Sequence, residues 1–266
     1  MRVVSWNINS VRLRINAVEN FVEEYDPDIL CLQEIKVSDD SYPISAFKEM
    51  GFSSHATFGQ KGYHGVSTHS KIPITRVHKK YWCNKNDSRH LHLKLKNGVS
   101  LHNFYVPAGG DRPDIETNEK FAHKLKFLEE ITKWFKKDKL NNNSILLGDL
   151  NIAPLETDVW SHKQLLKIVS HTPIETEYLN ALMKSGLWVD AVRKIIPPEQ
   201  KLYSWWSYRS PKWEVSDRGR RLDHIWVSPD LEKKVENALI AKSVRGWIKP
   251  SDHAPVIVDF SPNYFK

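Results

Sequence analysis

Residues 3–34 read VVSWNINSVRLRINAVENFVEEYDPDILCLQE, and this stretch decides the fold class. Its two ends, residues 3–8 and 28–33, are short apolar runs of the kind that form buried strands. Between them, apolar side chains recur at alternating spacings of four and three, which is one face of an amphipathic helix that ends at Pro27. These side chains are Val11, Ile15, Val18, Val22 and Tyr25. The strand-helix-strand unit predicts an α/β domain whose second strand carries Glu34 at its C-terminal end.

The rest of the chain continues this mixture of strands and helices. Residues 90–96 and 99–106 flank Asn97-Gly98, a two-residue turn typical of an antiparallel hairpin. Apolar periodicity predicts a long helix over residues 121–135, and further strands are predicted at residues 145–148, 222–227, 238–242 and 255–260. Because no linker or low-complexity tract separates the two halves, we expect one domain, residues 1–266, with two packed sheets and helices outside them.

The composition favours a polyanion as partner. The 39 Lys and Arg residues against 32 Asp and Glu residues give a net charge of +7, which attracts nucleic acid or anionic lipid. The chain has two cysteines, so no disulfide framework or cysteine-based zinc site is expected. The N-terminus passes directly into a strand pattern, and no segment approaches the ~20 apolar residues of a membrane span. We therefore expect a cytoplasmic protein that does not enter a membrane.

Several polar side chains follow or precede these predicted strands. They are Asn7, Glu34, Asp149, Asn151, Asp223 and the pair Asp252-His253. Any one of them could be a helix cap or a turn residue. Repeated placement beside buried strands, however, gathers carboxylates, amides and an imidazole along one edge of the domain. That set of groups predicts a metal-assisted phosphodiesterase.

Seven ordered motifs make the chain recognisable. They are residues 6–12 (WNINSVR), 32–36 (LQEIK), 59–66 (GQKGYHGV), 103–107 (NFYVP), 147–154 (LGDLNIAP), 221–224 (RLDH) and 251–256 (SDHAPV). Together they resemble the motifs of the exonuclease III family of abasic-site endonucleases, within the endonuclease/exonuclease/phosphatase superfamily. The resemblance spans essentially the whole chain. It implies a four-layer α/β sandwich like that of deoxyribonuclease I, with two mixed β-sheets packed face to face and helices outside.

The resemblance implies a metal site of hard oxygen ligands. Glu34 and Asp252 are the expected ligands of Mg²⁺, with Mn²⁺ as a substitute. Asn9 matches a position of the same site where some relatives carry Asp, and an amide there removes one negative charge. Asn7 resembles the family residue that hydrogen-bonds within the metal and phosphate site.

The resemblance also assigns roles around the phosphate. Asp149 is the expected group that orients and deprotonates the attacking water, with help from Asn151. His253, oriented by Asp223, is expected to donate to a phosphate oxygen, because an imidazole paired with a carboxylate favours its cationic form. Tyr105 is expected to donate its hydroxyl to the same phosphate.

Two positions depart from the family pattern. Ala108 stands where relatives usually carry Asn or Gln, and we expect Arg112 to supply the missing phosphate contact. The pocket for a flipped-out abasic sugar matches Trp205, Arg220 and Leu222, with Arg220 at a position where a relative has Trp.

Three classes of function remain open. The favoured one is a DNA-repair phosphodiesterase that cuts duplex DNA 5′ to abasic sites and has 3′-5′ exonuclease and 3′-end-cleaning activity. We expect it to act as a monomer, associated with the nucleoid if the source is bacterial. The second is a superfamily phosphatase or phospholipase acting on a phosphoinositide or sphingomyelin, which would not need Tyr105 or Trp205. The third, a non-catalytic DNA-binding relative, would normally have lost one of the acids, and none is lost.

Overall fold

A computed structural model describes residues 1–137 and 142–261 of the chain. Two six-stranded sheets form its centre. The first sheet has the strand order β13-β14-β1-β2-β4-β3 and the second β5-β6-β7-β8-β12-β9. Each sheet is mixed, because β1 and β2 run parallel in the first, β7 and β8 run parallel in the second, and the other pairs are antiparallel.

The strands of the first sheet are β1 (Arg2–Asn7), β2 (Ile29–Gln33), β3 (Ser54–Phe58), β4 (Val66–Ser70), β13 (Val235–Ile240) and β14 (Val256–Phe260). Those of the second are β5 (Ile74–Lys79), β6 (His90–Leu95), β7 (Ser100–Tyr105), β8 (Ser144–Asp149), β9 (Val189–Asp190) and β12 (Asp223–Val227). A two-stranded ribbon, β10 (Trp205–Trp206) with β11 (Gly219–Arg220), stands beside them.

The two sheets pack face to face through one hydrophobic cluster. Val3 and Ile29 of the first sheet lie in it together with Leu91, Leu101 and Leu147 of the second, and all five are fully buried. Alternate residues of the same strands point away from this cluster, as the period of two in a strand requires. These outward apolar side chains form the contact surface for helices on both sides.

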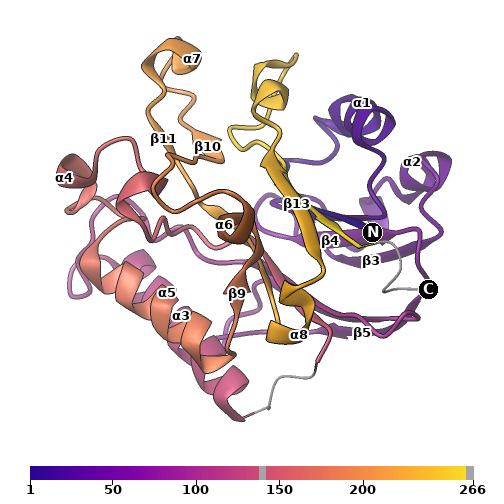
Figure 1. The fold of residues 1–266 in the computed structure, drawn as a ribbon, viewed down its shortest axis with the longest axis horizontal. Coiled ribbons are helices and arrows are strands. Elements are labelled where there is room, and N and C mark those ends of the chain that lie inside the picture. The colour runs from indigo at the N-terminus through magenta and orange to yellow at the C-terminus, as the bar shows by residue number, and fades with distance from the viewer. Residues whose placement is uncertain (138–141, 262–266) are drawn as a thin grey trace.

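The helices lie outside the sheets, which makes four layers. In Figure 1, α1 (Ile15–Tyr25) and α2 (Ile44–Glu49) lie on one flank, and α3 (Glu119–Lys137) and α5 (Pro173–Ser185) lie on the opposite flank. Phe21 and Phe47 pack α1 and α2 onto the first sheet, while Phe127 and Leu179 pack α3 and α5 onto the second. The remaining helices are short: α4 (His162–Leu165), α6 (Ala191–Ile195), α7 (Trp213–Ser216) and α8 (Pro229–Glu232). None of the helices in the described residues is both long enough and apolar enough to cross a lipid bilayer.

The predicted elements agree with the structure, with small shifts of their ends. The strand-helix-strand unit is present as β1, α1 and β2, and the hairpin at Asn97-Gly98 joins β6 to β7. The helix over residues 121–135 is α3, and the predicted strand over residues 238–242 begins three residues earlier, at Val235. The four-layer α/β sandwich is therefore confirmed.

Candidate functional site

The candidate site lies where strands from both sheets end together. In the first sheet, parallel β1 and β2 end at Asn7 and at the residue before Glu34. In the second, parallel β7 and β8 end at Tyr105 and Asp149, and antiparallel β12 begins with Asp223 directly opposite Asp149. Parallel strands present their carboxyl ends at one edge of a sheet, so these five side chains lie close together in space.

Gly148 explains why Asp149 can lie in this position. Its φ is +138°, and a Cβ atom there would lie 1.9 Å from the carbonyl oxygen of Phe104 on the neighbouring strand. Any side chain would force the two strands apart, because such an approach is closer than atoms can pack. Glycine thus keeps β8 tight against β7, with Asp149 beside Tyr105.

Asn7 joins the two halves of the site. Its Nδ2 donates to Glu34 Oε1 at 2.9 Å and to Asp149 Oδ2 at 2.9 Å, and the side chain is fully buried. A buried amide with both N–H groups paired is held in one orientation. Asn7 therefore fixes a carboxylate of the first sheet relative to a carboxylate of the second.

His253 lies between two acids. Its Nδ1 is 2.8 Å from Asp223 Oδ2, and its Nε2 is 3.8 Å from Asp149 Oδ2. Burial disfavours the charged ring, but the two carboxylates outweigh burial and raise the pKa of His253 above its usual value. Burial also raises the pKa of Asp149, an effect that the positive His253 opposes and the nearby Asp223 reinforces. The arrangement holds a cationic imidazole next to a carboxylate that can accept a proton.

Glu34 is surrounded by donors. Tyr105 OH donates to Glu34 Oε1 at 2.7 Å, and Lys36 Nζ lies 3.0 Å from Oε2. Burial acts to raise the pKa of Glu34, but Lys36, Asn7 and Tyr105 together lower it below the usual value. The pKa of Tyr105 is raised well above its usual value by burial and by Glu34 and Asp149, so its hydroxyl keeps its proton. The Tyr105 hydroxyl, expected to donate to phosphate, donates here to Glu34.

Asp252 is held through both of its oxygens. Asn9 Nδ2 donates to Oδ1 at 3.1 Å, and Trp205 Nε1 donates to Oδ2 at 2.9 Å. Asn9 in turn accepts a hydrogen bond from Lys36 Nζ at its Oδ1, at 2.5 Å. The Lys36 ammonium thus links two of the predicted metal ligands, Glu34 and Asn9, and the Asn9 amide links them to the third, Asp252.

The residues present fit a hard cation. Glu34 and Asp252 offer carboxylate oxygens and Asn9 offers an amide oxygen. The Lys36 ammonium contacts Glu34 Oε2 and Asn9 Oδ1, so these oxygens already attract positive charge. In the described residues, ligand atoms of Asp149, Asp223 and His253 lie within 4.8 Å of one another. His253 Nδ1 is hydrogen-bonded to Asp223 in that set, so the set suits proton transfer better than metal binding.

A cleft of about 810 Å³ opens over these groups. Its walls include Glu34, Asp149, Asn151, Asp252, His253, Trp205, Arg220 and Leu222. Asn7, Asn9, Tyr105 and Asp223 do not line it but hold residues that do. Arg112 is exposed and does not line it; its neighbour Asp111 does.

Arg220 is tied to the protein in this structure. Its Nη1 donates to Val169 O at 3.0 Å and to Ser170 Oγ at 2.8 Å. The guanidinium carbon lies 5.3 Å from the centroid of the Trp205 ring, the partner of Arg220 in the β10–β11 ribbon. Arg220 therefore forms part of the cleft wall rather than a free arm.

Sequence reasoning missed several residues at the site. Lys36, the last residue of the LQEIK motif, contacts Glu34 two positions before it, and the motif alone did not indicate this contact. Arg209 and Arg218, on either side of α7, line the cleft. The guanidinium carbon of Arg218 lies 4.7 Å from the centroid of the Trp160 ring. A cluster of arginines beside tryptophans was the available signal for them.

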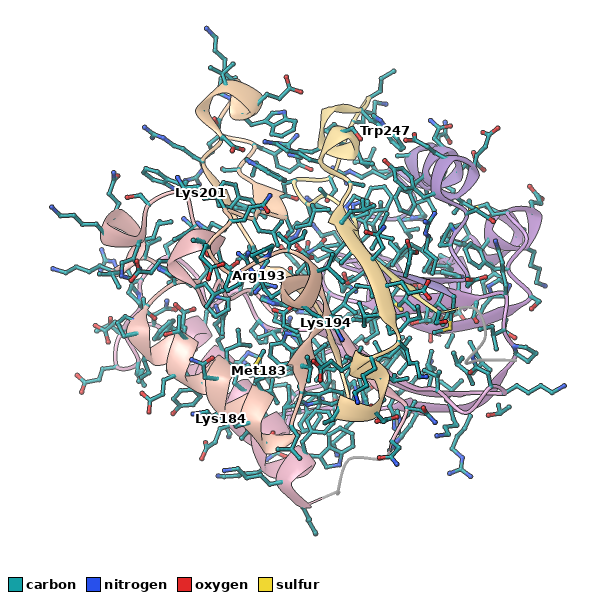
Figure 2. The ribbon with its side chains drawn as sticks, in the orientation of Figure 1. Met183, Lys184, Arg193, Lys194, Lys201 and Trp247 are labelled. Carbon is teal, nitrogen blue, oxygen red and sulfur yellow. The ribbon has the colours of Figure 1, made fainter. Side chains whose placement is uncertain are left out.

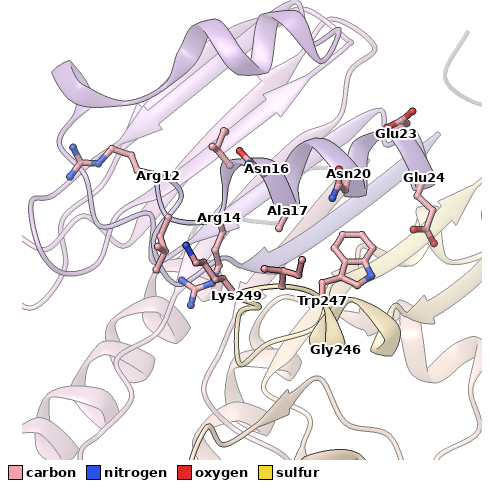
Figure 3. A pocket seen from close by; sticks show the side chains of 13 residues that line it. Arg12, Arg14, Asn16, Ala17, Asn20, Glu23, Glu24, Gly246, Trp247 and Lys249 are labelled. Atoms are coloured by element: carbon pink, nitrogen blue, oxygen red, sulfur yellow. The ribbon is translucent and has the colours of Figure 1, made fainter.

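A second hollow of about 1060 Å³ lies between α1 and the segment 246–249 (Figure 3). It adjoins the site, because Arg14 in its wall donates to the backbone oxygen of Asn9. Arg12 and Lys249 line it together with Trp247.

Comparisons with known proteins agree with this geometry. The Endonuclease/Exonuclease/phosphatase family matches residues 4–253. Exodeoxyribonuclease III of Haemophilus influenzae is 33% identical, covering 98% of this chain and 100% of that protein. A solved 3′ phosphatase from Neisseria, bound to a product DNA hairpin, has a TM-score of 0.90 at 28% identity, covering 98% of this chain and 99% of its own. An AP endonuclease from Archaeoglobus fulgidus also has a TM-score of 0.90, at 29% identity, with the same coverage.

The family match extends from β1 to His253, so it includes every strand end that builds the site. The relatives match over nearly their full length, and their fold is that of two mixed sheets with helices outside. The chain therefore belongs to the exonuclease III family of hydrolases, within the Endonuclease/Exonuclease/phosphatase family.

Proposed function

We propose that this protein hydrolyses phosphodiester bonds of duplex DNA on the 5′ side of abasic sites and also removes blocking groups from 3′ ends. The observation that carries the proposal is the contact of His253 with Asp223 and Asp149 in a cleft that is also lined by Glu34 and Asp252. Such a cleft offers a proton acceptor, a cationic donor and carboxylates for a metal at one phosphate.

Glu34 and Asp252 would hold the metal, with Asn9 beside them, and we propose Mg²⁺ as the ion. Bound there, the ion would neutralise a non-bridging phosphate oxygen and stabilise the leaving 3′-oxygen. Lys36 contributes a fixed positive charge next to Glu34. Asn7 and Tyr105 keep the Glu34 carboxylate oriented through their hydrogen bonds to Oε1.

Asp149 would orient and deprotonate the attacking water. Burial raises its pKa, which makes the carboxylate a better proton acceptor than an exposed aspartate. Asn151 donates one Nδ2 hydrogen to Val106 O at 2.9 Å, which orients the amide, and its amide oxygen would accept a hydrogen bond from that water. His253 would donate to the phosphate oxygen that gains charge in the transition state, with Asp223 holding the ring.

Substrate choice would come from the cleft wall. Trp205 and Leu222 supply an apolar surface for a sugar that lacks its base, and such a sugar costs less to flip out than a paired nucleotide. Arg220 completes the wall, and Arg112 remains our candidate for a phosphate contact outside it. The end of the hollow lined by Arg12 and Lys249, away from Glu23 and Glu24, would hold the DNA strand as it leaves the site. The whole chain would act as one domain and as a monomer.

One assay tests the proposal. A duplex carrying a single tetrahydrofuran abasic analogue, labelled at its 5′ end, is incubated with the purified protein and Mg²⁺. We expect one cut on the 5′ side of the analogue that leaves a 3′-hydroxyl, while an intact duplex of the same sequence is not cut internally. Hydrolysis of a phosphoinositide or of sphingomyelin, with no cut in either duplex, would overturn the proposal in favour of a superfamily phosphatase or phospholipase.

A further inference from the structure

Lys124 is a fully buried cation in the N-terminal third of α3, on the flank of the second sheet. Its Nζ forms an ion pair with Glu175 of α5, whose side chain is also fully buried. The same Nζ donates to two backbone oxygens outside the helices, Asn151 O at 2.8 Å and Ala108 O at 3.3 Å. An ammonium group has three N–H donors, and these three acceptors use all of them.

The two backbone oxygens belong to loops that line the cleft. Ala108 and Asn151 follow the ends of β7 and β8, and both are among the cleft-lining residues. Asn151 has a φ of +55°, a left-handed conformation that is uncommon for residues other than glycine, although Asn adopts it more readily than most. Its remaining bonds run from its N to Asp149 Oδ1 and from Nδ2 to Val106 O. Asp149 and Val106 belong to the ends of β8 and β7 or to the loops that follow them, whereas Lys124 holds Asn151 from α3.

The Lys124 side chain is tightly packed. A Cβ atom on Gly109 would lie 3.0 Å from Lys124 Cδ and 3.1 Å from Val169 Cγ1. Glu175 is equally fixed, because it also accepts hydrogen bonds from Ser170 N and Thr172 Oγ1. An ammonium with such neighbours has one available position, so the carbonyls it holds are fixed as well.

We propose that Lys124 is a positioning residue for hydrolysis: its ammonium fixes the backbone of Asn151 so that the Asn151 amide oxygen meets the attacking water. The inference rests on the proposed function for the water and the phosphate. Burying a charge beside a reaction site is costly unless it is paired, and pairing with Glu175 meets that cost. A small displacement of Asn151 is expected to reduce the rate without weakening DNA binding, because it misplaces a group that acts on the water.

Two variants separate positioning from stability. Lys124→Met removes the donor to Asn151 O, whereas Glu175→Gln breaks the same ion pair but leaves the Lys124 ammonium beside Asn151 O and Ala108 O. We expect Lys124→Met to lower kcat on the abasic duplex on the order of 10²-fold with KM little changed, and Glu175→Gln to stay within about 3-fold of the parent, at a temperature where both are folded. Should Lys124→Met fail to fold, the double variant Lys124→Met/Glu175→Gln, which leaves no unpaired carboxylate, takes its place with the same expected loss.

A second readout does not depend on activity. Backbone amide hydrogen exchange over residues 149–153 should be faster in Lys124→Met than in the parent and unchanged in Glu175→Gln. Equal kcat losses in the two variants, or unchanged exchange in Lys124→Met, would overturn the inference. If the parent protein cuts no phosphodiester at all, the proposed function fails, while the exchange experiment still decides whether Lys124 fixes this loop.

Discussion

The indole Nε1 of Trp205 donates a 2.9 Å hydrogen bond to Asp252 Oδ2, so a residue of the proposed sugar pocket also orients a proposed metal ligand. Trp205 lines the cleft and is the β-bridge partner of His253, the residue after Asp252. The proposed sugar pocket and the proposed metal site therefore share one side chain.

Two substitutions at Trp205 separate these roles. Trp205→Phe removes the N–H but keeps an aromatic wall, so we expect the apparent affinity for Mg²⁺ to fall about 10-fold, equally on an abasic duplex and on a 3′-phosphate end. Trp205→Ala removes the wall as well and should lower cleavage at abasic sites far more than removal of a 3′-phosphate, which needs no flipped sugar. Both effects are read from Mg²⁺ titrations of the two reactions. Equal losses on the two substrates for Trp205→Ala would make Trp205 a packing and orienting residue only.

Metal dependence follows from the oxygen ligands. Activity should require Mg²⁺ or Mn²⁺ and disappear in excess EDTA, and Glu34→Ala should weaken metal binding, because it removes a carboxylate ligand. Isothermal titration of Mn²⁺ into the parent and the variant measures this without turnover. Full activity in EDTA, or identical Mn²⁺ binding by Glu34→Ala, would contradict the assignment.

A buried ion triad makes part of the stability depend on pH. Asp158 accepts hydrogen bonds from Arg221 Nε at 2.7 Å and from Arg193 of α6 at 2.5 Å, and Figure 2 labels Arg193. Burial acts to raise the pKa of Asp158, but the two arginines lower it below the usual value. A carboxyl group with a lowered pKa stabilises the folded state above its unfolded pKa of about 3.9, and this stability is lost as the pH falls through the folded pKa.

Asp158→Asn should therefore lower the free energy of unfolding at pH 7 by about 3 to 5 kcal/mol, because it leaves buried arginine charge without one of its carboxylates. Urea unfolding of both proteins between pH 7 and pH 3 provides the measurement. The difference between them should stay constant down to about pH 4 and shrink below it. A difference that is the same at pH 3 as at pH 7 would mean that the charge of Asp158 contributes nothing.

The net charge of +7 predicts a steep salt dependence of DNA binding. Each phosphate neutralised by Lys or Arg releases counterions, so log K should fall linearly with log salt, with a slope of about −0.9 for each phosphate contacted. Replacing Lys249 by Ala, in the hollow beside α1, should make the slope less negative by about 1. Fluorescence anisotropy with a labelled duplex gives both slopes, and a flat response would argue against duplex DNA as the substrate.

The sequence predicted those parts of the fold that depend on local patterns. The β1-α1-β2 unit and the β6–β7 hairpin have clear apolar periods and a two-residue Asn-Gly turn. β4 was missed, because four of its five residues, Ser67 to Ser70, are polar and yet fully buried. Their burial depends on partners distant in the chain, such as Tyr42 for Ser67. α5 was missed although Thr172 and Glu175 form a capping box that marks its start.

At the site, too, the sequence predicted what local motifs encode and missed contacts between distant segments. Motif order pointed to residues that the structure brings together, such as Asn7 with Asp149 and Asp223 with His253. It did not reveal that Arg220 is anchored to Val169 O, or that Lys124 reaches Asn151 O, because both contacts join segments far apart in the sequence. Such contacts are set by packing, and no local pattern encodes them.

The most direct test is single-turnover cleavage of the abasic duplex by Asp149→Asn and His253→Ala, with DNA affinity measured on the same preparations. In the proposed roles both side chains act mainly in the transition state, so we predict that the rate falls on the order of 10²-fold or more for each variant while the dissociation constant for DNA changes little. A loss of affinity as large as the loss of rate, or a rate that is unchanged in either variant, would contradict the roles proposed for Asp149 and His253.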